Sequence, residues 1–199
     1  MKVVGIMGGT FNPIHLGHIA IARAAREQFN IPEILVMPSY SPAYKDNLCI
    51  ASPEHRINMI SLAIKDYDYM HISTIETDRR GKTYTADTLA EIKEDYDLIY
   101  FIIGGDSLFA LQNWYKPDYI CKHCHLLAAN RDNHNSTELM KQKAFLEDNY
   151  GANIDFIKCD DYPFSSTLIR DCVKQGQSIS KYVGEDVADY IISNKLYID

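Results

Sequence analysis

The chain has 199 residues, of which 46% are hydrophobic and 24% charged, the composition of a globular domain of ordinary size. Asp and Glu number 27 against 20 Lys and Arg, which gives a formal net charge of −7 at pH 7 and argues against general binding to nucleic acid or to an anionic membrane. No run of about 18 apolar residues predicts a transmembrane helix, and the first residues do not resemble a secretory leader. With an odd number of cysteines, five, we expect reduced thiols and a cytoplasmic protein.

Apolar runs alternate with helix-compatible segments, and this alternation predicts a Rossmann-like three-layer α/β/α fold with a mainly parallel sheet of about six strands. No repeat or composition break divides residues 1–199, so we expect a single domain with helices at its C-terminal end. The predicted strands are Val3–Met7, Ile34–Met37, Met70–Ile75, Leu98–Ile103, Leu126–Ala129 and Ile154–Ile157. The predicted helices are Gly17–Phe29, Pro53–Ile64, Thr85–Tyr96, Ser136–Tyr150, Ser166–Gln175 and Glu185–Ser193.

The first predicted strand leads into residues 8–18, which have the sequence Gly-Gly-Thr-Phe-Asn-Pro-Ile-His-Leu-Gly-His. A glycine-rich turn that opens a helix gathers backbone N–H groups at the helix N-terminus, where the macrodipole favours phosphate. His15 and His18 are three residues apart, so they share one helix face and both could donate to one phosphate. We expect Gly17 to leave room for that phosphate. Taken alone, a His-x-Gly-His pattern marks a simple capped helix start about as often as it marks a catalytic pair.

The segment from Pro38 to Pro53 is the least regular part of the chain, and a loop of this length predicts a functional role, here on the substrate side. Lys45 in this loop carries a charge suited to phosphate, although an exposed lysine without a function explains it equally well.

Polar residues also follow two later predicted strands. Asp106 comes after two glycines at a strand's carboxyl end, where open α/β sheets bind their ligands, although it could also cap the next helix. Arg131 is placed similarly and could meet phosphate. Trp114, the single tryptophan, is either part of a ligand pocket or a core residue.

Cysteines and histidines at positions 121–125, Cys-Lys-His-Cys-His, have the spacing of a c-type haem attachment site and of a zinc-binding pair. Haem attachment takes place outside the cytoplasm, and further zinc ligands are distant in sequence, so we expect no metal site there. We interpret Tyr119 to Ala129 as the lead-in to a strand. A haem electron carrier would show a Soret band.

Near the C-terminus, Phe-Ser-Ser-Thr-Leu-Ile-Arg spans residues 164–170. Ser165, Ser166 and Thr167 can cap a helix and bind phosphate, and Arg170 lies one turn further on. Two phosphate sites suggest a nucleoside triphosphate held at both ends. We expect the final Leu196, Tyr197 and Ile198 to pack back onto the core.

Together, the motifs at 8–18 and 164–170 resemble those of the nucleotidyltransferase superfamily. The His-x-Gly-His form, the length, Thr-Tyr-Thr-Ala-Asp-Thr-Leu at 83–89, Ile-Ile-Gly-Gly-Asp-Ser-Leu at 102–108 and the Trp-Tyr pair at 114–115 are similar to bacterial nicotinate-nucleotide adenylyltransferases. The resemblance spans almost the whole chain. It implies transfer of the adenylyl group of ATP to nicotinate mononucleotide, giving deamido-NAD and pyrophosphate in NAD biosynthesis, with Mg²⁺ accompanying ATP. Two residues depart from the family pattern: Asn12 stands where Asp is usual, and Tyr44 precedes Lys45 where His is commoner.

The resemblance also implies roles for individual residues. His15 and His18 would be the catalytic donors, and Trp114 would stack on the nicotinate ring. Residues implied in ATP binding are Gly8, Gly9, Thr10, Phe11, His15, His18, Gly104, Asp106, Arg131, Ser165, Ser166, Thr167 and Arg170. Residues implied in binding the pyridine nucleotide are Lys45, Thr85, Ala86, Asp106, Trp114 and Tyr115.

Three other interpretations stay open at the level of sequence. Phosphopantetheine adenylyltransferases share the fold, but they have a Thr-x-Gly-His pattern, a shorter chain and no counterpart of the segments at 83–89 and 114–115. A preference for nicotinamide mononucleotide would depend on backbone donors that a sequence does not display. A non-catalytic nucleotide sensor could use the same fold. The sequence does not decide whether the chain forms a homo-oligomer.

Overall fold

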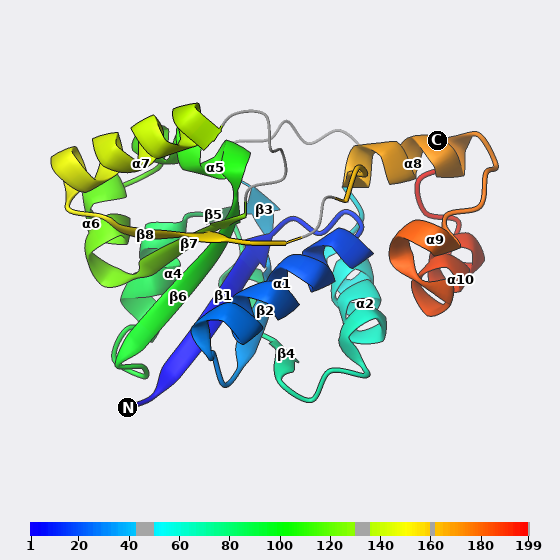
Figure 1. Cartoon of the computed structure of the whole chain (residues 1–199). Helices are drawn as coiled ribbons and strands as arrows, with labels where there is room; N and C mark the ends of the chain where they lie inside the picture. The colour runs from blue at the N-terminus through cyan, green and yellow to red at the C-terminus, as the bar shows by residue number, and fades with distance from the viewer. Residues whose placement is uncertain (43–49, 130–135, 160–161, 199) are drawn as a thin grey trace.

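The computed structural model describes residues 1–42, 50–129, 136–159 and 162–198, and a six-stranded sheet forms its centre (Figure 1). Neighbouring strands are parallel throughout, in the order β4-β2-β1-β6-β7-β8. This confirms the predicted fold class. The strands, in that order, are Met70–Ile72, Ile34–Pro38, Val3–Gly9, Leu98–Gly104, His125–Ala129 and Asn153–Ile157.

Successive side chains of the central strands enter two separate apolar clusters, one on each face of the sheet. In β6, Phe101 and Ile103 belong to one cluster and Ile102 to the other. In β7, Leu126 and Leu127 divide in the same way. Because side chains alternate across a strand, a strand buried on both faces is a continuous apolar run, which is why these strands were predictable from sequence.

Helices cover both faces of the sheet. On the face shared with the first cluster lie α1 (Leu16–Phe29), α2 (Pro53–Ile64), α8 (Ser166–Lys174), α9 (Ser180–Val183) and α10 (Glu185–Ser193). On the other face lie α3 (Ile75–Arg79), α4 (Thr85–Ile92), α5 (Gly105–Ala110), α6 (Pro117–His123) and α7 (Ser136–Tyr150), with a short 3₁₀ turn, η1 (Leu111–Asn113), after α5. Figure 1 shows α8, α9 and α10 grouped at the end of the molecule nearest α2, as expected for C-terminal helices.

Several predicted boundaries were wrong. The strand expected from Met70 ends at Ile72, and Ile75 instead begins α3, from which it packs against the second cluster. The helix expected to reach Tyr96 ends at Ile92. Tyr119 lies in α6 rather than in a lead-in to β7. These errors share a cause, because apolar residues in short elements fit helix and strand patterns equally well.

The predicted loop after β2 begins with regular structure. Pro38 is the last residue of β2, and β3 (Ser41–Pro42) pairs in parallel with β5 (Lys82–Thr83) to form a separate two-stranded sheet. The central part of the loop, residues 43–49, lies outside the described residues. This small sheet joins the segment after β2 to the segment before α4.

At the chain's end, Tyr197 is buried and Leu196 packs against the first cluster, as expected. Ile198 is 55% exposed, so the prediction that it packs onto the core was wrong. No helix in the described parts of the chain is both long and apolar enough to cross a membrane.

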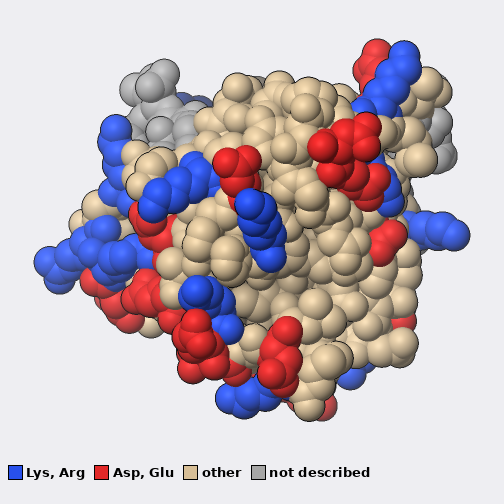
Figure 2. All heavy atoms as spheres, turned by 90° about the vertical axis from the view of Figure 1, so that its left-hand side faces the viewer, with Lys and Arg blue, Asp and Glu red and all other residues tan. Residues whose placement is uncertain are grey.

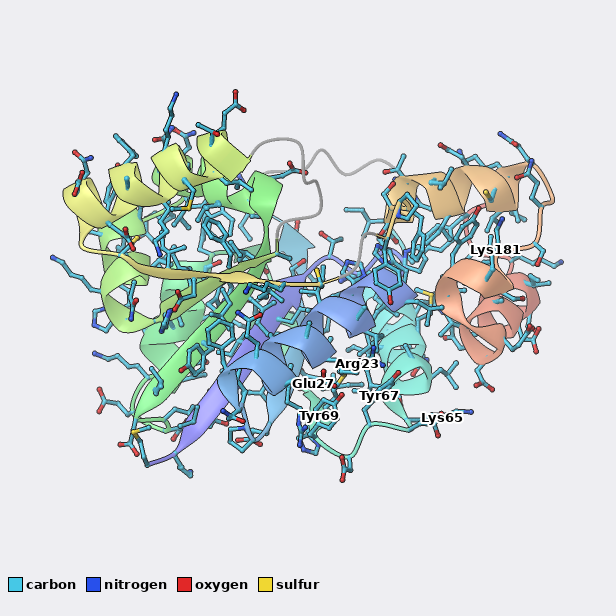
Figure 3. The ribbon with its side chains drawn as sticks, in the orientation of Figure 1. Arg23, Glu27, Lys65, Tyr67, Tyr69 and Lys181 are labelled. Atoms are coloured by element: carbon cyan, nitrogen blue, oxygen red, sulfur yellow. The ribbon has the colours of Figure 1, made fainter. Side chains whose placement is uncertain are left out.

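A cluster of tyrosines and arginines lies at the amino-terminal edge of the sheet, beside the last turns of α1 (Figure 3). The guanidinium of Arg26 lies 4.2 Å from the centre of the Tyr69 ring, and Tyr67 meets Tyr69 edge to face. Arg23 and Glu27 form an ion pair of 3.8 Å along α1. Burial raises the pKa of Tyr69. These contacts fix the segment before β4 to α1.

Charges of both signs are interspersed on the side of the molecule that Figure 2 shows, the side nearest α6 and α7 in Figure 1. Acidic and basic side chains lie next to one another there rather than forming one basic surface. This face therefore lacks the continuous positive field that attracts nucleic acid without sequence preference.

The carboxyl ends of the parallel strands share one edge of the sheet. The order in which the chain adds strands reverses at β1. From β1 the order continues through β2 to β4 on one side, whereas β6 and the later strands lie on the other side. The switch point therefore falls between the ends of β1 and β6, at Gly9 and Gly104. Open α/β sheets bind ligands at such a crevice.

Candidate active site at the carboxyl edge of the sheet

The turn between β1 and α1 is tightly packed around one aromatic ring. Phe11 is 3% exposed and has a left-handed backbone with φ of 48°. A Cβ atom at Gly9 would lie 3.1 Å from Cζ of Phe11, closer than nearly all real contacts of this kind. Glycine at position 9 therefore allows the Phe11 ring to fold back onto the end of β1.

His15 and His18 lie together at the start of α1, as predicted. Their rings stack with centroids 3.7 Å apart, and His15 is the N-cap residue. The backbone N–H of His15 donates to Nδ1 of His18 over 3.2 Å. Because Nδ1 of His18 accepts this bond, the neutral ring carries its proton on Nε2. His18 thus keeps a donor for a ligand at Nε2.

Close packing also surrounds the buried imidazole of His15. The ring of Phe164, just before α8, meets it edge-on at 5.5 Å. A Cβ atom at Gly17 would lie 3.1 Å from Nδ1 of His15 and 3.3 Å from Cβ of Tyr162. The sequence predicted that Gly17 leaves room for phosphate. In the structure, the missing side chain of Gly17 instead leaves room for His15 and Tyr162.

The C-terminal motif lies directly against this turn. Ser165 is the N-cap of α8 and accepts a bond from the backbone N–H of Leu168 over 3.2 Å. Ser166 Oγ donates to the carbonyl of Pro13 over 2.9 Å. Two regions that are about 150 residues apart in sequence are thus joined, and the N-termini of α1 and α8 lie at one place.

Arg170 makes a second bridge between α8 and the turn. Its Nη1 donates to the carbonyl of Asn12 over 2.9 Å, and its Nη2 donates to Oγ1 of Thr167 over 3.2 Å. The sequence predicted that Arg170 reaches a ligand, whereas the structure shows that it also holds the turn. Thr167 is exposed at the start of α8.

Asn12 is a buried junction that the sequence did not predict. Its Oδ1 accepts from the backbone N–H of Ala51 over 3.0 Å and from the hydroxyl of Tyr197 over 2.8 Å. Burial raises the pKa of Tyr197, so its phenol stays protonated and can donate. The end of the chain and the end of the loop after β2 are therefore both bonded to the turn between β1 and α1.

Arg56 in α2 is a further residue at the turn that the sequence did not identify. Its side chain is completely buried, and it donates to the carbonyls of Thr10, Tyr40 and Ala51. Loss of hydration on burial lowers the pKa of its guanidinium. In sequence it is indistinguishable from an ordinary helix-surface arginine.

The end of β6 forms the other side of the switch point. Gly104 is the N-cap of α5, and a Cβ atom there would meet nothing within 4 Å. Asp106 is exposed in the first turn of α5 and is not the cap, so the capping alternative for this residue was wrong. A Cβ at Gly105 would lie 3.3 Å from the carbonyl oxygen of Ala129, which explains the second glycine by close packing of α5 on β7.

Four of the six residues predicted to hold a pyridine nucleotide, Thr85, Ala86, Trp114 and Tyr115, lie at the start of α4 or just after η1. Thr85 begins α4, followed by buried Ala86. The ring of Tyr115 lies 4.9 Å from that of Tyr84, which directly precedes α4. Trp114 is partly buried and packs against the second cluster, so it has a core role and also an accessible part. The structure thus brings Thr85 and Tyr115 into one neighbourhood.

A buried carboxyl group in α3 is bonded to α4. Glu76 in α3 accepts a bond of 2.7 Å from Oγ1 of Thr88, and Arg79 donates to the same hydroxyl over 2.9 Å. Burial is the main cause that raises the pKa of Glu76. The sequence did not single out this network, because its members look like surface charges of two short helices.

Comparison with known proteins places this geometry in a family. Residues 6–172 match the family model described as cytidylyltransferase-like. The chain belongs to the cytidylyltransferase-like family. A probable nicotinate-nucleotide adenylyltransferase of Lachnoclostridium phytofermentans is 42% identical over 200 residues, covering 100% of both chains. A probable nicotinate-nucleotide adenylyltransferase of Clostridium botulinum, strain Eklund 17B, is 34% identical and covers 99% of this chain and 98% of the relative.

Solved structures show that the fold is shared as well. Nicotinic acid mononucleotide adenylyltransferase of Plasmodium falciparum, complexed with NaAD, superposes with a TM-score of 0.77 at 22% identity and covers 99% of this chain and 98% of that chain. The comparisons confirm the resemblance found in the sequence and the prediction that this member of the cytidylyltransferase-like family is a nucleotidyltransferase.

Other predicted residues of this cytidylyltransferase-like chain lie elsewhere or outside the described ranges. Tyr44, Lys45 and Arg131 belong to segments that the structure does not describe. Cys121 and Cys124 are buried at the end of α6, and burial raises the pKa of the Cys121 thiol to about 11. Within the described ranges, no group of three or more His, Cys, Asp or Glu side chains is arranged to hold a metal ion.

Proposed function

We propose that this enzyme transfers the adenylyl group of ATP to nicotinate mononucleotide, forming deamido-NAD and releasing pyrophosphate in NAD biosynthesis. The names of the full-length relatives support the choice of acceptor. The observation that carries the proposal is the junction of the two phosphate-type motifs, where Ser166 and Arg170 bond to carbonyls of the β1–α1 turn.

The reaction is a direct in-line displacement. An oxygen of the nicotinate mononucleotide phosphate attacks the α-phosphorus of ATP, and the bond between that phosphorus and the bridging oxygen to the β-phosphorus breaks. The attacking phosphate is already ionised near neutral pH, so the reaction needs neither a protein base nor a covalent intermediate. The enzyme contributes alignment and stabilisation of charge.

In this proposal, His15 and His18 stabilise the α- and β-phosphates as negative charge shifts toward the leaving group. The proton on Nε2 of His18 follows from the bond that its Nδ1 accepts from His15. A donor already held in place costs little reorganisation when the transition state forms. The peptide amides of residues 8–11 and the N-terminus of α1 add to the same field.

The outer phosphates lie at α8 in this proposal. Ser165, Ser166 and Thr167 form the start of α8, and Arg170 reaches back toward them by its bond to Thr167. Mg²⁺ bound to the phosphates of ATP would offset part of their charge, because proteins commonly bind this ion through substrate phosphates with few ligands of their own. Gly104, Asp106 and Arg131 complete the proposed ATP site.

The pyridine nucleotide occupies the side of the crevice near α4. Thr85 and the backbone at Ala86 and Tyr115 hold the nicotinate carboxylate, Trp114 stacks on the ring, and Lys45 meets the phosphate. Asp106 contacts a ribose. The proximity of the Tyr84 and Tyr115 rings supports this placement, because it brings the segment before α4 next to the segment after η1.

Pyrophosphate release tests the function directly. The purified protein is supplied with Mg²⁺ and ATP and, in parallel, nicotinate mononucleotide, nicotinamide mononucleotide or phosphopantetheine. We expect the highest kcat/KM with nicotinate mononucleotide and deamido-NAD as the product. A higher kcat/KM with another acceptor would assign a different substrate, and no release with any of them would favour a nucleotide sensor.

The proposal extends to the whole chain. We propose one nucleotidyltransferase domain over residues 1–199, because the bond from Tyr197 to Asn12 ties the last segment to the first turn. We also propose a cytoplasmic location, which the free thiols of Cys121, Cys124 and Cys172 support.

A further inference from the structure

Arg56 is a buried cation beneath the β1–α1 turn. Its Nε donates to Ala51 over 3.0 Å, its Nη1 to Thr10 over 2.9 Å and its Nη2 to Tyr40 over 3.2 Å, with a backbone carbonyl as the acceptor in each bond. These carbonyls come from the end of β1, from the segment after β2 and from the approach to α2. One side chain therefore connects three segments at the carboxyl edge of the sheet.

The charge of Arg56 has no carboxylate partner within the described residues, since none of the ion pairs there includes it. A guanidinium stays protonated in proteins, and burying an unpaired charge is costly. Tyr197 is near enough to interact electrostatically, but its phenol is neutral. The carbonyl dipoles offset only part of this positive charge, so it favours an anion bound at the β1–α1 turn, to which Arg56 is bonded through Thr10.

The bond to Thr10 also sets the orientation of the turn. In a planar trans peptide, the C=O and N–H groups point in opposite directions. Since the Thr10 carbonyl points to Arg56, the N–H of Phe11 points away from the guanidinium. Arg56 thus fixes the face on which this turn presents a backbone donor.

We propose that Arg56 is a positioning residue for the triphosphate: it holds the β1–α1 turn with its amide directed outward, and its buried charge is balanced by bound ATP. This inference rests on the proposed function for the identity of the nucleotide. It concerns binding of ATP rather than choice of acceptor, so it can be tested separately.

Arg56→Lys and Arg56→Met separate charge from geometry. Lysine keeps the charge but not the three-way set of bonds, whereas methionine removes both. The matched control is Arg26→Met in α1, since Arg26 packs on Tyr69, which Figure 3 shows at the opposite edge of the sheet. Titration calorimetry measures the Kd of each full-length protein for ATP and, as a base-free probe, inorganic tripolyphosphate, at a temperature where circular dichroism shows it folded.

We expect Arg56→Met to weaken binding of both ligands by about tenfold or more, equivalent to about 1.4 kcal/mol. The Kd of Arg56→Lys should lie between those of Arg56→Met and the wild type. Its KM for ATP should rise by a larger factor than its kcat falls. Arg26→Met should bind within about twofold of the wild type even if its Tm is lower. If Arg56→Met does not fold, Arg56→Lys decides the question by the same criterion.

A purely structural role predicts a lower Tm with an unchanged Kd in the folded variants, and this result would overturn the inference. Equal weakening by Arg26→Met would also overturn it. Wild-type protein that binds ATP tightly but forms no deamido-NAD would refute the proposed function while leaving the role of Arg56 intact.

Discussion

Substituting Gly17 by alanine isolates the packing of His15 from its chemistry. The added Cβ would lie 3.1 Å from Nδ1 and 3.2 Å from Cε1 of His15, whereas ordinary contacts begin at 3.4 Å. The imidazole must therefore move by about 0.3 Å, and the 3.3 Å approach to Tyr162 hinders movement of the new methyl group in the other direction. The substitution changes no donor of the site.

Two effects on stability oppose one another in Gly17→Ala. Alanine in a helix is favoured over glycine by about 1 kcal/mol, which offsets the strain from a displaced ring. We therefore expect the free energy of unfolding to change by less than about 1 kcal/mol. A small misplacement of a catalytic group is more costly for the reaction, so kcat should fall by about tenfold or more.

Steady-state pyrophosphate release and urea denaturation measure the two quantities on the same preparation. Leu16→Ala is the control, because Leu16 is the exposed neighbour at the start of α1 and its truncation leaves the contact between positions 15 and 17 in place. It should keep kcat near that of the wild type. A Gly17→Ala enzyme with full kcat would refute the argument that the glycine positions His15.

The remaining predictions concern four other side chains. His18→Ala should lower kcat by about 100-fold, the usual cost of removing one transition-state donor, and unchanged turnover in the pyrophosphate assay would remove its catalytic role. Arg170→Ala should chiefly raise the KM for ATP, and an effect confined to the KM for nicotinate mononucleotide would contradict the assignment. Tyr197→Phe deletes the hydroxyl that donates to Asn12 and should cost about 1 kcal/mol in urea denaturation, whereas an unchanged midpoint would show that the bond contributes nothing. Because burial raises the pKa of Glu76, the folded state keeps this proton to higher pH than the unfolded chain, and stability is lost as pH rises through that interval. Glu76→Gln removes this loss, so its stability relative to wild type should increase as the pH rises above about 4, and parallel profiles would argue against it.

Sequence predicted the elements whose pattern is local. The run Leu98–Gly104 is apolar throughout because both of its faces are buried, and the turn after β1 has glycine and histidine at adjacent positions that need no tertiary information to identify. The short helix α6 was missed, although Pro117 at its first turn is a common start signal. Elements with little periodicity are the ones that sequence patterns resolve poorly.

The site residues that the sequence did not predict have no local pattern, because their roles depend on partners that are distant in sequence. Arg56 is buried and bonds to the carbonyls of residues 10, 40 and 51. The spacing of residues within α2 gives no indication of these distant partners. Tyr197 was predicted to pack as an apolar residue, which is correct for its ring, but its hydroxyl bonds to Asn12, 185 residues earlier. A carbonyl acceptor leaves no mark in the sequence, because every residue has one.

The turn after β1 combines these two kinds of residue. Carbonyl oxygens repel phosphate, and three carbonyls of this turn accept bonds from side chains outside it: Thr10 from Arg56, Asn12 from Arg170 and Pro13 from Ser166. These bonds occupy the negative ends of the peptide dipoles, and two of the three donors are cationic. By the same trans-peptide geometry that orients the N–H of Phe11, the bond to Pro13 directs the N–H of Ile14 away from Ser166. The serine and arginine of the C-terminal motif therefore make the turn more suitable for an anion through these bonds alone, which gives a physical reason why two motifs so far apart in sequence lie side by side.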